Sequence, residues 1–174
     1  MSILTLVQLN KNEFGKKNTS LRVPSQEVSD FGESFQKIVD DLIETLKYHK
    51  IAIGLSAPQV GIPSRLSVIN LNKEKVEPTL IIVNPKILLI SGKKDKKKES
   101  CMSLPHFRGE VERKYKISIS YQDRFGKSNH LEAEGFLARV LCHEIDHLEG
   151  ILYVDRMKSL SELEPVDFFK NTAT

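Results

Sequence analysis

The sequence predicts an α+β fold, in which mostly antiparallel sheets pack around a central HExxH-bearing helix and an amphipathic helix lies near the N-terminus. Two segments with apolar residues at helical spacing bracket a series of short β-type runs, an order that favours segregated helices and strands. The 174 residues, 40% hydrophobic and 28% charged, have an ordinary globular balance. We therefore expect one domain over residues 1–157 and a short C-terminal tail over residues 158–174.

The individual elements follow from the spacing of apolar side chains. The first helix is predicted over residues 29–50, where six apolar residues recur at helical spacing: Phe35, Ile38, Val39, Leu42, Ile43 and Leu46. A turn-rich segment follows over residues 54–63. The β-type runs are residues 66–71, 80–83, 87–90, 116–121 and 131–133, with a hairpin turn at Phe125-Gly126. Helical periodicity returns at Phe136 and ends at Gly150, a natural C-terminal cap.

The formal net charge of +3 is small for this length, and five lysines between residues 93 and 98 carry much of the excess. We interpret this run as an exposed loop tip. No aromatic residues are interleaved with the lysines, so we predict no direct binding of nucleic acid. No apolar run approaches the roughly 20 residues that span a bilayer, and the first residues lack the pattern of a secretory signal. We expect a cytoplasmic protein without a membrane partner, and an organellar origin stays open.

The segment His143-Glu144-Ile145-Asp146-His147 lies inside the second predicted helix. Two histidines four residues apart stand on one face of a helix, so their imidazoles can converge on a single ion. Glu144 follows the first histidine, where it can accept a proton from a metal-activated water. This segment predicts a metal-dependent hydrolase, with His143 and His147 as ligands and Glu144 as the proton-transfer group.

An open catalytic metal site needs a third protein ligand. A histidine six residues after His147 would complete one known pattern, but Tyr153 stands there. Glu162 and Glu164 would suit a metallopeptidase, although they fall in the weakly patterned tail. Cys142 projects about 100° away from His143 around the helix and is interpreted as a packing residue. Cys101 is the other cysteine, and its neighbourhood alone leaves it between core filler and ligand.

Three segments together resemble the signature motifs of the peptide deformylase family, in the same order and at approximately the same spacing. They are GLSAPQVG, ESCMSLP and HEIDH, and the resemblance extends from about Ile51 to Leu152. It implies that Cys101 is the third metal ligand, beside His143 and His147, and that Glu144 is catalytic. It also implies that the side-chain amide of Gln59 and the backbone N–H of Met102 donate hydrogen bonds to the developing oxyanion.

The resemblance further implies the reaction and its substrate. The expected reaction is hydrolysis of the N-formyl group on the initiator methionine of nascent polypeptides, with transient ribosome contact. Fe2+ is favoured as the physiological ion, and Zn2+, Ni2+ or Co2+ also suit the ligands. The substrate backbone would pair near Ile53 and Gly54. The methionine pocket would be lined by Phe136, Val140 and Ile53, and the residues that support the ligands would be Glu99, Arg108, Arg113 and Asp146.

The sequence departs from the family at four motif positions. Ala52 and Ser100 stand where glycine is common, Ser56 where alanine is common, and Cys142 where glutamine is common. None of these changes removes a ligand, Glu144 or Gln59. Because Ala52 and Ser100 alter the substrate cleft, two further interpretations stay open: a hydrolase acting on another N-acyl amide, and a non-catalytic deformylase-like binding protein.

Overall fold

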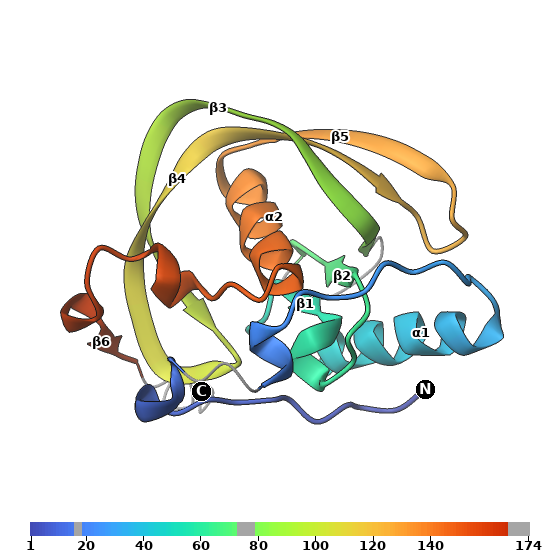
Figure 1. The fold of residues 1–174 in the computed structure, drawn as a ribbon, viewed down its shortest axis with the longest axis horizontal. Helices are drawn as coiled ribbons and strands as arrows, with labels where there is room; N and C mark the ends of the chain where they lie inside the picture. Colours follow the sequence, from blue (N-terminus) through green and yellow to red (C-terminus); the bar gives the residue numbers. More distant parts are fainter. Residues whose placement is uncertain (16–18, 73–78, 167–174) are drawn as a thin grey trace.

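The fold is an antiparallel sheet that wraps around one helix and carries a second helix on its other side (Figure 1). The computed structural model describes residues 1–15, 19–72 and 79–166. The sheet order is β1-β2-β3-β4-β5, with β6 pairing with β4, and every pair is antiparallel. The strands are β1 Gly54–Ser56, β2 Leu66–Ile69, β3 Leu80–Cys101, β4 Leu104–Gln122, β5 Ser128–Glu134 and β6 Glu164–Pro165. The prediction of an α+β fold with antiparallel strands is confirmed.

The strands β3 and β4 form a long ribbon that arches around the second helix (Figure 1). The two runs predicted at residues 80–83 and 87–90 belong to this one strand, with bulges between them. The prediction that the lysine run is a loop tip is therefore wrong. Lys94 and Lys96 lie in β3 and form diagonal ion pairs with Glu112 and Glu110 of β4, at nitrogen–oxygen distances of 2.6 and 3.0 Å. Cross-strand ion pairs of this kind let a like-charged run remain extended beside its partner strand.

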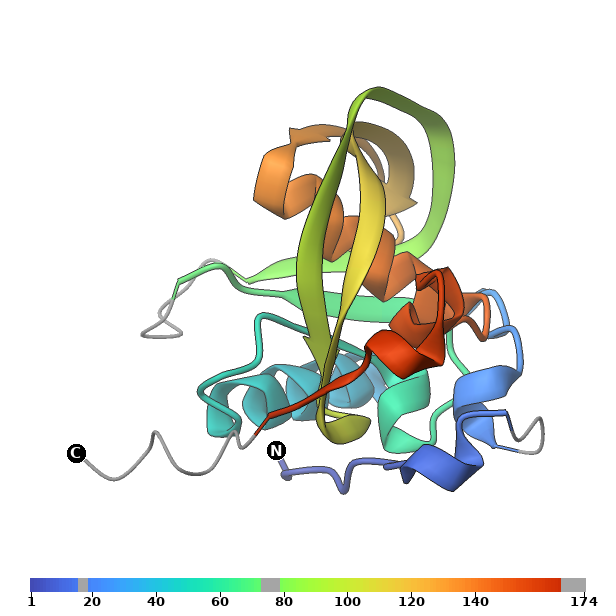
Figure 2. The ribbon, with the colours of Figure 1, turned by 90° about the vertical axis from the view of Figure 1, so that its left-hand side faces the viewer.

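The first helix, α1, spans Glu33–Tyr48 and lies under β1 and β2. Its fully buried side chains include Val39, Leu42 and Leu46, which pack against Leu55 and other residues of the two strands. Figure 2 shows β1 and β2 between α1 and the second helix. The two strands therefore have apolar neighbours on both faces, and their side chains are mostly buried.

The second helix, α2, spans Gly135–Leu148 and contains the HEIDH segment. Leu141 and Ile145 pack against strand residues such as Ile82 and Ile119. Gly150 follows the helix end with φ 72°, the left-handed conformation expected of a glycine cap. A Cβ atom at this position would lie 2.7 Å from the carbonyl carbon of Arg22, so the close approach also requires glycine.

Five short 3-10 helices complete the described chain: Lys11–Glu13, Ser20–Arg22, Ala57–Val60, Tyr153–Arg156 and Leu160–Glu162. The predicted hairpin turn at Phe125-Gly126 joins β4 to β5. Within the predicted tail, residues 164–165 form β6 against β4, and residues 167–174 lie outside the described residues. Among the helices of the described residues, none is long and apolar enough to cross a membrane.

Candidate active site

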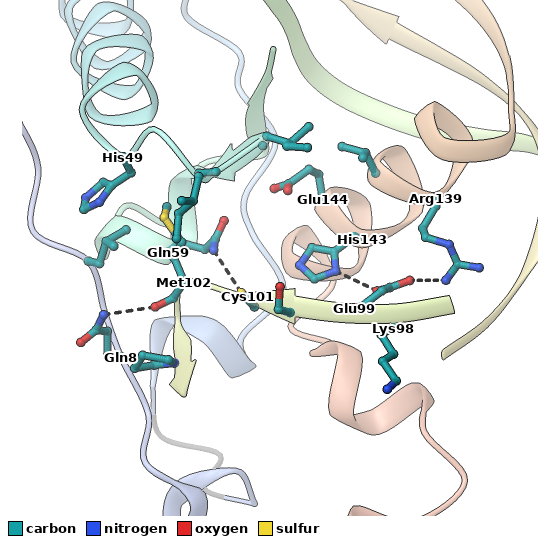
Figure 3. A pocket seen from close by; sticks show the side chains of 18 of the residues that line it. Gln8, His49, Gln59, Lys98, Glu99, Cys101, Met102, Arg139, His143 and Glu144 are labelled. Carbon is teal, nitrogen blue, oxygen red and sulfur yellow. Dashed lines mark hydrogen bonds and ion pairs between the residues drawn. The ribbon is translucent and has the colours of Figure 1, made fainter. Parts of the chain in front are cut away.

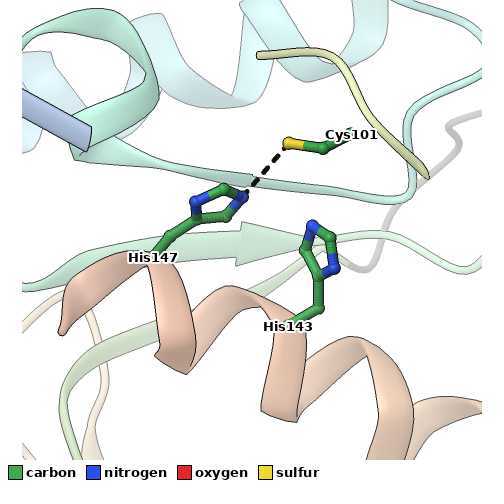
Figure 4. A group of neighbouring side chains, drawn as sticks. All are labelled: Cys101, His143 and His147. Carbon is green, nitrogen blue, oxygen red and sulfur yellow. Dashed lines mark hydrogen bonds between the residues drawn. The ribbon is translucent and has the colours of Figure 1, made fainter. Parts of the chain in front are cut away.

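Three potential metal ligands meet where the end of β3 contacts α2 (Figure 4). Cys101 is the last residue of β3, and His143 and His147 lie one turn apart on α2. Their ligand atoms all lie within 4.8 Å of one another, and Cys101 Sγ is 3.3 Å from His147 Nε2. A thiolate with two imidazoles is a donor set that suits zinc, ferrous iron, cobalt or nickel. The residues present therefore fit the single divalent ion that the sequence predicts.

The orientation of His143 is set by Glu99. His143 Nδ1 lies 2.9 Å from Oε2 of Glu99, which leaves Nε2 of the imidazole available for a metal. Metal-binding histidines commonly use this arrangement, because a carboxylate on the second ring nitrogen fixes the tautomer. Nδ1 of His147 is buried and has no hydrogen-bond partner within the described part of the chain.

The electrostatics of the cluster favour the thiolate form of Cys101. Burial opposes ionisation of Cys101, but His147 and His143 outweigh it and hold the pKa of this thiol well below its usual range. Burial likewise opposes the charge on His143, but hydrogen bonds to Cys101 and Glu99 hold its pKa above the usual range. A thiolate is the form of cysteine that binds metals. A metal cation held at this position would likewise favour the thiolate.

Glu99 is the centre of a buried ion-pair network. Arg113 donates to both carboxylate oxygens, at 2.6 and 2.9 Å, and also donates to Asp146 at 2.9 Å. Arg139 adds a further hydrogen bond to Glu99 at 2.7 Å. Three of the four predicted supporting residues, Glu99, Arg113 and Asp146, therefore lie together. Arg139 was not predicted, because nothing in the local sequence pairs a helical arginine with a glutamate 40 residues earlier.

Arg108 lies apart from this network. Its side chain is 46% exposed and pairs with Glu164 of β6 at 3.0 Å. The structure therefore does not bring Arg108 to the metal ligands, and its ion pair instead joins β4 to β6. The reason is its place on β4: Arg108 and Arg113 are five residues apart, so they face opposite sides of the strand.

Glu144 follows His143 on α2, and its side chain is buried beside β1. Its carboxylate approaches Gly54 so closely that a Cβ atom there would lie 2.3 Å from Oε1. The other oxygen, Oε2, accepts a hydrogen bond from Ser56 Oγ at 2.5 Å. Burial raises the pKa of Glu144 above its usual value, although His143, His147 and Ser56 act in the opposite direction. A buried carboxyl with a raised pKa is suited to proton transfer.

Gln59 is held in one orientation by its surroundings. It lies in the 3-10 helix Ala57–Val60, is 2% exposed, and accepts a hydrogen bond from the backbone N–H of Ser56 at 2.8 Å. Its amide nitrogen consequently points to Cys101 Sγ, at 3.4 Å, and to Ser103 Oγ, at 3.3 Å. Met102 follows Cys101 in the tight turn between β3 and β4. The two hydrogen-bond donors predicted for the oxyanion, the Gln59 side chain and the Met102 backbone, thus both lie next to Cys101.

A cavity of about 300 Å³ opens onto this cluster (Figure 3). All four residues predicted to contact substrate line it: Ile53, Gly54, Phe136 and Val140. Phe136 is 58% exposed, so it forms a rim rather than a buried wall. Further lining residues that the sequence did not predict are Leu6, Gln8, His49 and Lys98.

The N-terminal segment forms one wall of this cavity. Val7 donates a backbone hydrogen bond to Gln59 at 2.7 Å, and Leu9 donates one to Ser103 at 2.8 Å. The side-chain amide of Gln8 donates to the carbonyl of Met102 at 3.2 Å. This segment thereby bridges the two parts of the chain that carry Gln59 and Met102. Pairing across more than 50 residues leaves no local signal in the sequence.

The four departures from the family pattern fall in different environments. Ala52 and Ser100 line the cavity, as expected. Cys142 packs in the apolar cluster between α2 and the sheet, and burial raises the pKa of its thiol, so its interpretation as a packing residue is confirmed. Ser56 is fully buried and contacts Glu144.

A cysteine–histidine donor group beside a buried carboxylate, at the base of an apolar cavity, is the arrangement typical of a metal-dependent hydrolase. Comparison with known proteins narrows this class. Residues 11–162 match the family model described as polypeptide deformylase. A peptide deformylase of Caldicellulosiruptor bescii is 44% identical over 137 residues, which cover 79% of each chain. The peptide deformylase of Bartonella quintana is 38% identical over 154 residues, 88% of this chain and 87% of the relative.

Solved structures agree with the sequence relatives. The crystal structure of peptide deformylase from Thermotoga maritima matches with a TM-score of 0.80 and 34% identity, covering 91% of this chain and all of that one. A Synechococcus elongatus deformylase, solved in complex with actinonin, matches with a TM-score of 0.81 and 37% identity, covering 91% and 81%. The chain belongs to the polypeptide deformylase family, and it is a hydrolase that removes a formyl group.

Proposed function

We propose that the chain removes the N-formyl group from the initiator methionine of nascent polypeptides, and that Cys101, His143 and His147 hold the metal ion on which this depends. The observation that supports this most directly is the meeting of three donor atoms within 4.8 Å beside Glu144, at the base of an apolar cavity. The helix α2, with its HEIDH segment, would then be the central catalytic helix of one domain over residues 1–157. Fe2+ is proposed as the physiological ion, as the family resemblance favours.

The roles of the protein groups follow from their positions. Cys101, His143 and His147 would hold a divalent ion, which would activate water at neutral pH. Glu144 accepts the proton of that water as the oxygen attacks the formyl carbon, and it later delivers a proton to the departing amine. Gln59 Nε2 and the backbone N–H of Met102 donate hydrogen bonds to the carbonyl oxygen as negative charge develops on it. Cleavage of the C–N bond then gives formate and a free amino terminus.

The substrate would lie along the cavity wall formed by β1. Ile53 and Gly54 offer backbone groups for strand-like pairing, and Gly54 leaves space because it has no side chain. Phe136, Val140 and Ile53 provide apolar surface for the methionine side chain. Glu99, Arg113 and Asp146 would hold His143 in place. We further propose a cytoplasmic location and a transient contact with the ribosome, where formylated chains emerge.

The test is formate release from a formyl-Met peptide by protein purified anaerobically with Fe2+ or Ni2+. We expect turnover that the Glu144→Gln variant loses by at least about a hundredfold, whereas Glu149→Gln, an exposed change at the end of the same helix, retains it. An acetyl-Met peptide, assayed in parallel, should be cleaved far more slowly. Faster cleavage of the acetyl peptide would replace the formyl assignment with another N-acyl amide, and full turnover by Glu144→Gln would contradict the role of Glu144.

Metal content tests the ligand assignment independently. The Cys101→Ser variant should lose most of its bound metal, because a serine hydroxyl is a poor substitute for a thiolate. A metallopeptidase that used Glu162 or Glu164 as its third ligand would keep the ion. Glu164 already pairs with Lys98 at 2.7 Å and with Arg108 on the surface, away from α2, which argues against that alternative.

A further inference from the structure

The hydroxyl of Ser56 lies at hydrogen-bonding distance from the carboxylate that the proposed function assigns to proton transfer. We propose that Ser56, supported by Ser67, is a positioning residue for Glu144. The Ser56 hydroxyl binds Oε2 of the carboxylate and leaves Oε1 as the oxygen that exchanges protons with substrate. The inference rests on the proposed role of Glu144. It concerns a position where the family commonly has alanine, a side chain that cannot make this hydrogen bond.

The three groups form a short chain of hydrogen bonds inside the protein. Ser56 Oγ lies 2.5 Å from Glu144 Oε2 and 2.8 Å from Ser67 Oγ. Ser56 and Ser67 are 0% and 1% exposed, and Glu144 is 4% exposed. An ionised carboxylate only accepts hydrogen bonds, so Ser56 must donate its single hydroxyl proton to Glu144. Its oxygen then accepts from Ser67, and this fixes the direction of both bonds.

The second oxygen of Glu144, Oε1, lies against Gly54. A Cβ atom at Gly54 would lie 2.3 Å from Oε1, so this oxygen occupies the space that the glycine leaves. Gly54 and Glu144 both line the cavity, whereas Ser56 and Ser67 are not among its lining residues. The carboxylate is therefore bound at Oε2 by a serine outside the cavity lining, and its Oε1 is left for the cavity side. A carboxylate with one oxygen engaged has a defined rotamer and a single reactive atom.

The strand pairing explains why two serines meet here. Ser56 ends β1 and lies directly opposite Ser67 of β2 in the antiparallel register. Both side chains point to the face that α2 covers, since Ser56 Oγ also lies 3.2 Å from the backbone carbonyl of Glu144. Two buried hydroxyls on that face would be costly without partners, and each has one in this chain.

Steady-state kinetics of the metal-loaded enzyme with a formyl-Met peptide test the proposal. The Ser56→Ala variant should lower kcat by about tenfold and leave KM within about twofold, because the lost hydrogen bond orients the reacting group and does not bind substrate. Metal content should stay at one ion per chain. Ser25→Ala is the matched control: it removes another buried hydroxyl, one without a partner in the described residues, and should leave kcat unchanged.

The Ser67→Ala variant supplies a second measurement if Ser56→Ala does not fold. It should lower kcat by about threefold with KM unchanged, since Ser56 keeps its bond to Glu144 but loses the donor that orients it. If both variants fold and both retain the wild-type kcat, the proposal is overturned. If Ser56→Ala does not fold, a wild-type kcat in Ser67→Ala overturns it. A fall in metal content that accounts for the whole loss of rate would also overturn it, because the role would then be structural. Full activity of Glu144→Gln would instead overturn the proposed function, so the two failures are distinguishable.

Discussion

The buried network around Glu99 makes a strong prediction about a residue that does not itself bind metal. Glu99 is buried and accepts four hydrogen bonds, two from Arg113, one from Arg139 and one from His143. The Glu99→Gln substitution preserves the size of the side chain but removes its charge. It also replaces one acceptor oxygen with an NH2 group that must face donors whichever way the amide is turned.

The magnitude follows from the burial of the partners. Arg113 and Arg139 have side chains 8% exposed, and that of Glu99 is 5% exposed, so water cannot replace the lost carboxylate. Breaking a buried pair in this way costs about 3–5 kcal/mol of unfolding free energy. For a chain of this length such a loss lowers Tm by roughly 6–20 °C. Because His143 also loses its orienting acceptor, metal affinity should fall by about 10–100-fold.

Two assays separate these effects. Urea denaturation of the metal-free protein measures the stability loss, and competition with a chromophoric chelator measures metal affinity. The control is Glu110→Gln, which breaks the exposed pair with Lys96 on the outer face of the same ribbon and should change neither quantity. If Glu99→Gln behaves like this control in both assays, the argument that the network supports the metal ligands is wrong.

The same variant has a defined pH dependence. Burial would raise the pKa of Glu99, but hydrogen bonds from His143 and Arg113 outweigh it and hold the pKa well below its usual range. The carboxylate therefore contributes stability that is fully present above about pH 4.5, the ordinary value, and is lost as the pH falls toward the lowered pKa. The difference in unfolding free energy between the wild type and Glu99→Gln should be constant from pH 7 to pH 5.5 and smaller at pH 3.5.

Two further predictions concern other buried groups. Burial raises the pKa of Glu144, so in metal-free protein its carboxyl carbon should titrate above pH 4.5 by NMR, with Glu144→Gln identifying the signal. Added Zn2+ should lower that pKa, because a nearby cation favours the ionised form, and a rise on adding Zn2+ would contradict this. The Tyr153 hydroxyl is buried without a hydrogen-bond partner in the described residues, so Tyr153→Phe should stabilise the protein by about 1 kcal/mol in urea denaturation. The exposed substitution Tyr48→Phe is its control, and destabilisation by Tyr153→Phe would show that the hydroxyl has a partner.

The sequence predicted those elements whose signals lie within a few neighbouring residues, such as the helices. Apolar spacing located both helices to within a few residues, and Gly150 marked the end of α2. The strand β3 was predicted in two fragments and without its lysine-rich half. Its extended conformation depends on pairing with residues of β4, and nothing within the run itself indicates which glutamates will pair with the lysines.

In the candidate site, too, residues within short motifs were predicted, whereas contacts between distant segments were not. The motifs predicted the residues that the structure brings together around the cavity, because each motif is a short segment with fixed spacing. Arg139, Gln8 and the contact between Ser56 and Glu144 depend on segments 40 to 94 residues apart. Such contacts follow from tertiary packing, and a single sequence carries no pattern from which they can be predicted.

The geometry of a strand beside a helix explains why the two metal-site motifs have the spacings they do. Glu99 and Cys101 are two residues apart on β3, so they share one face and lie about 6.6 Å apart along the strand. His143 and His147 are four residues apart on α2, about 6 Å along the helix axis. Because the two steps nearly match, Glu99 lies beside His143 at 2.9 Å, and Cys101 lies beside His147 at 3.3 Å while also contacting His143. Ser100 lies between them and is exposed, whereas Glu99 and Cys101 are buried, so a serine in place of the family's glycine leaves both contacts intact.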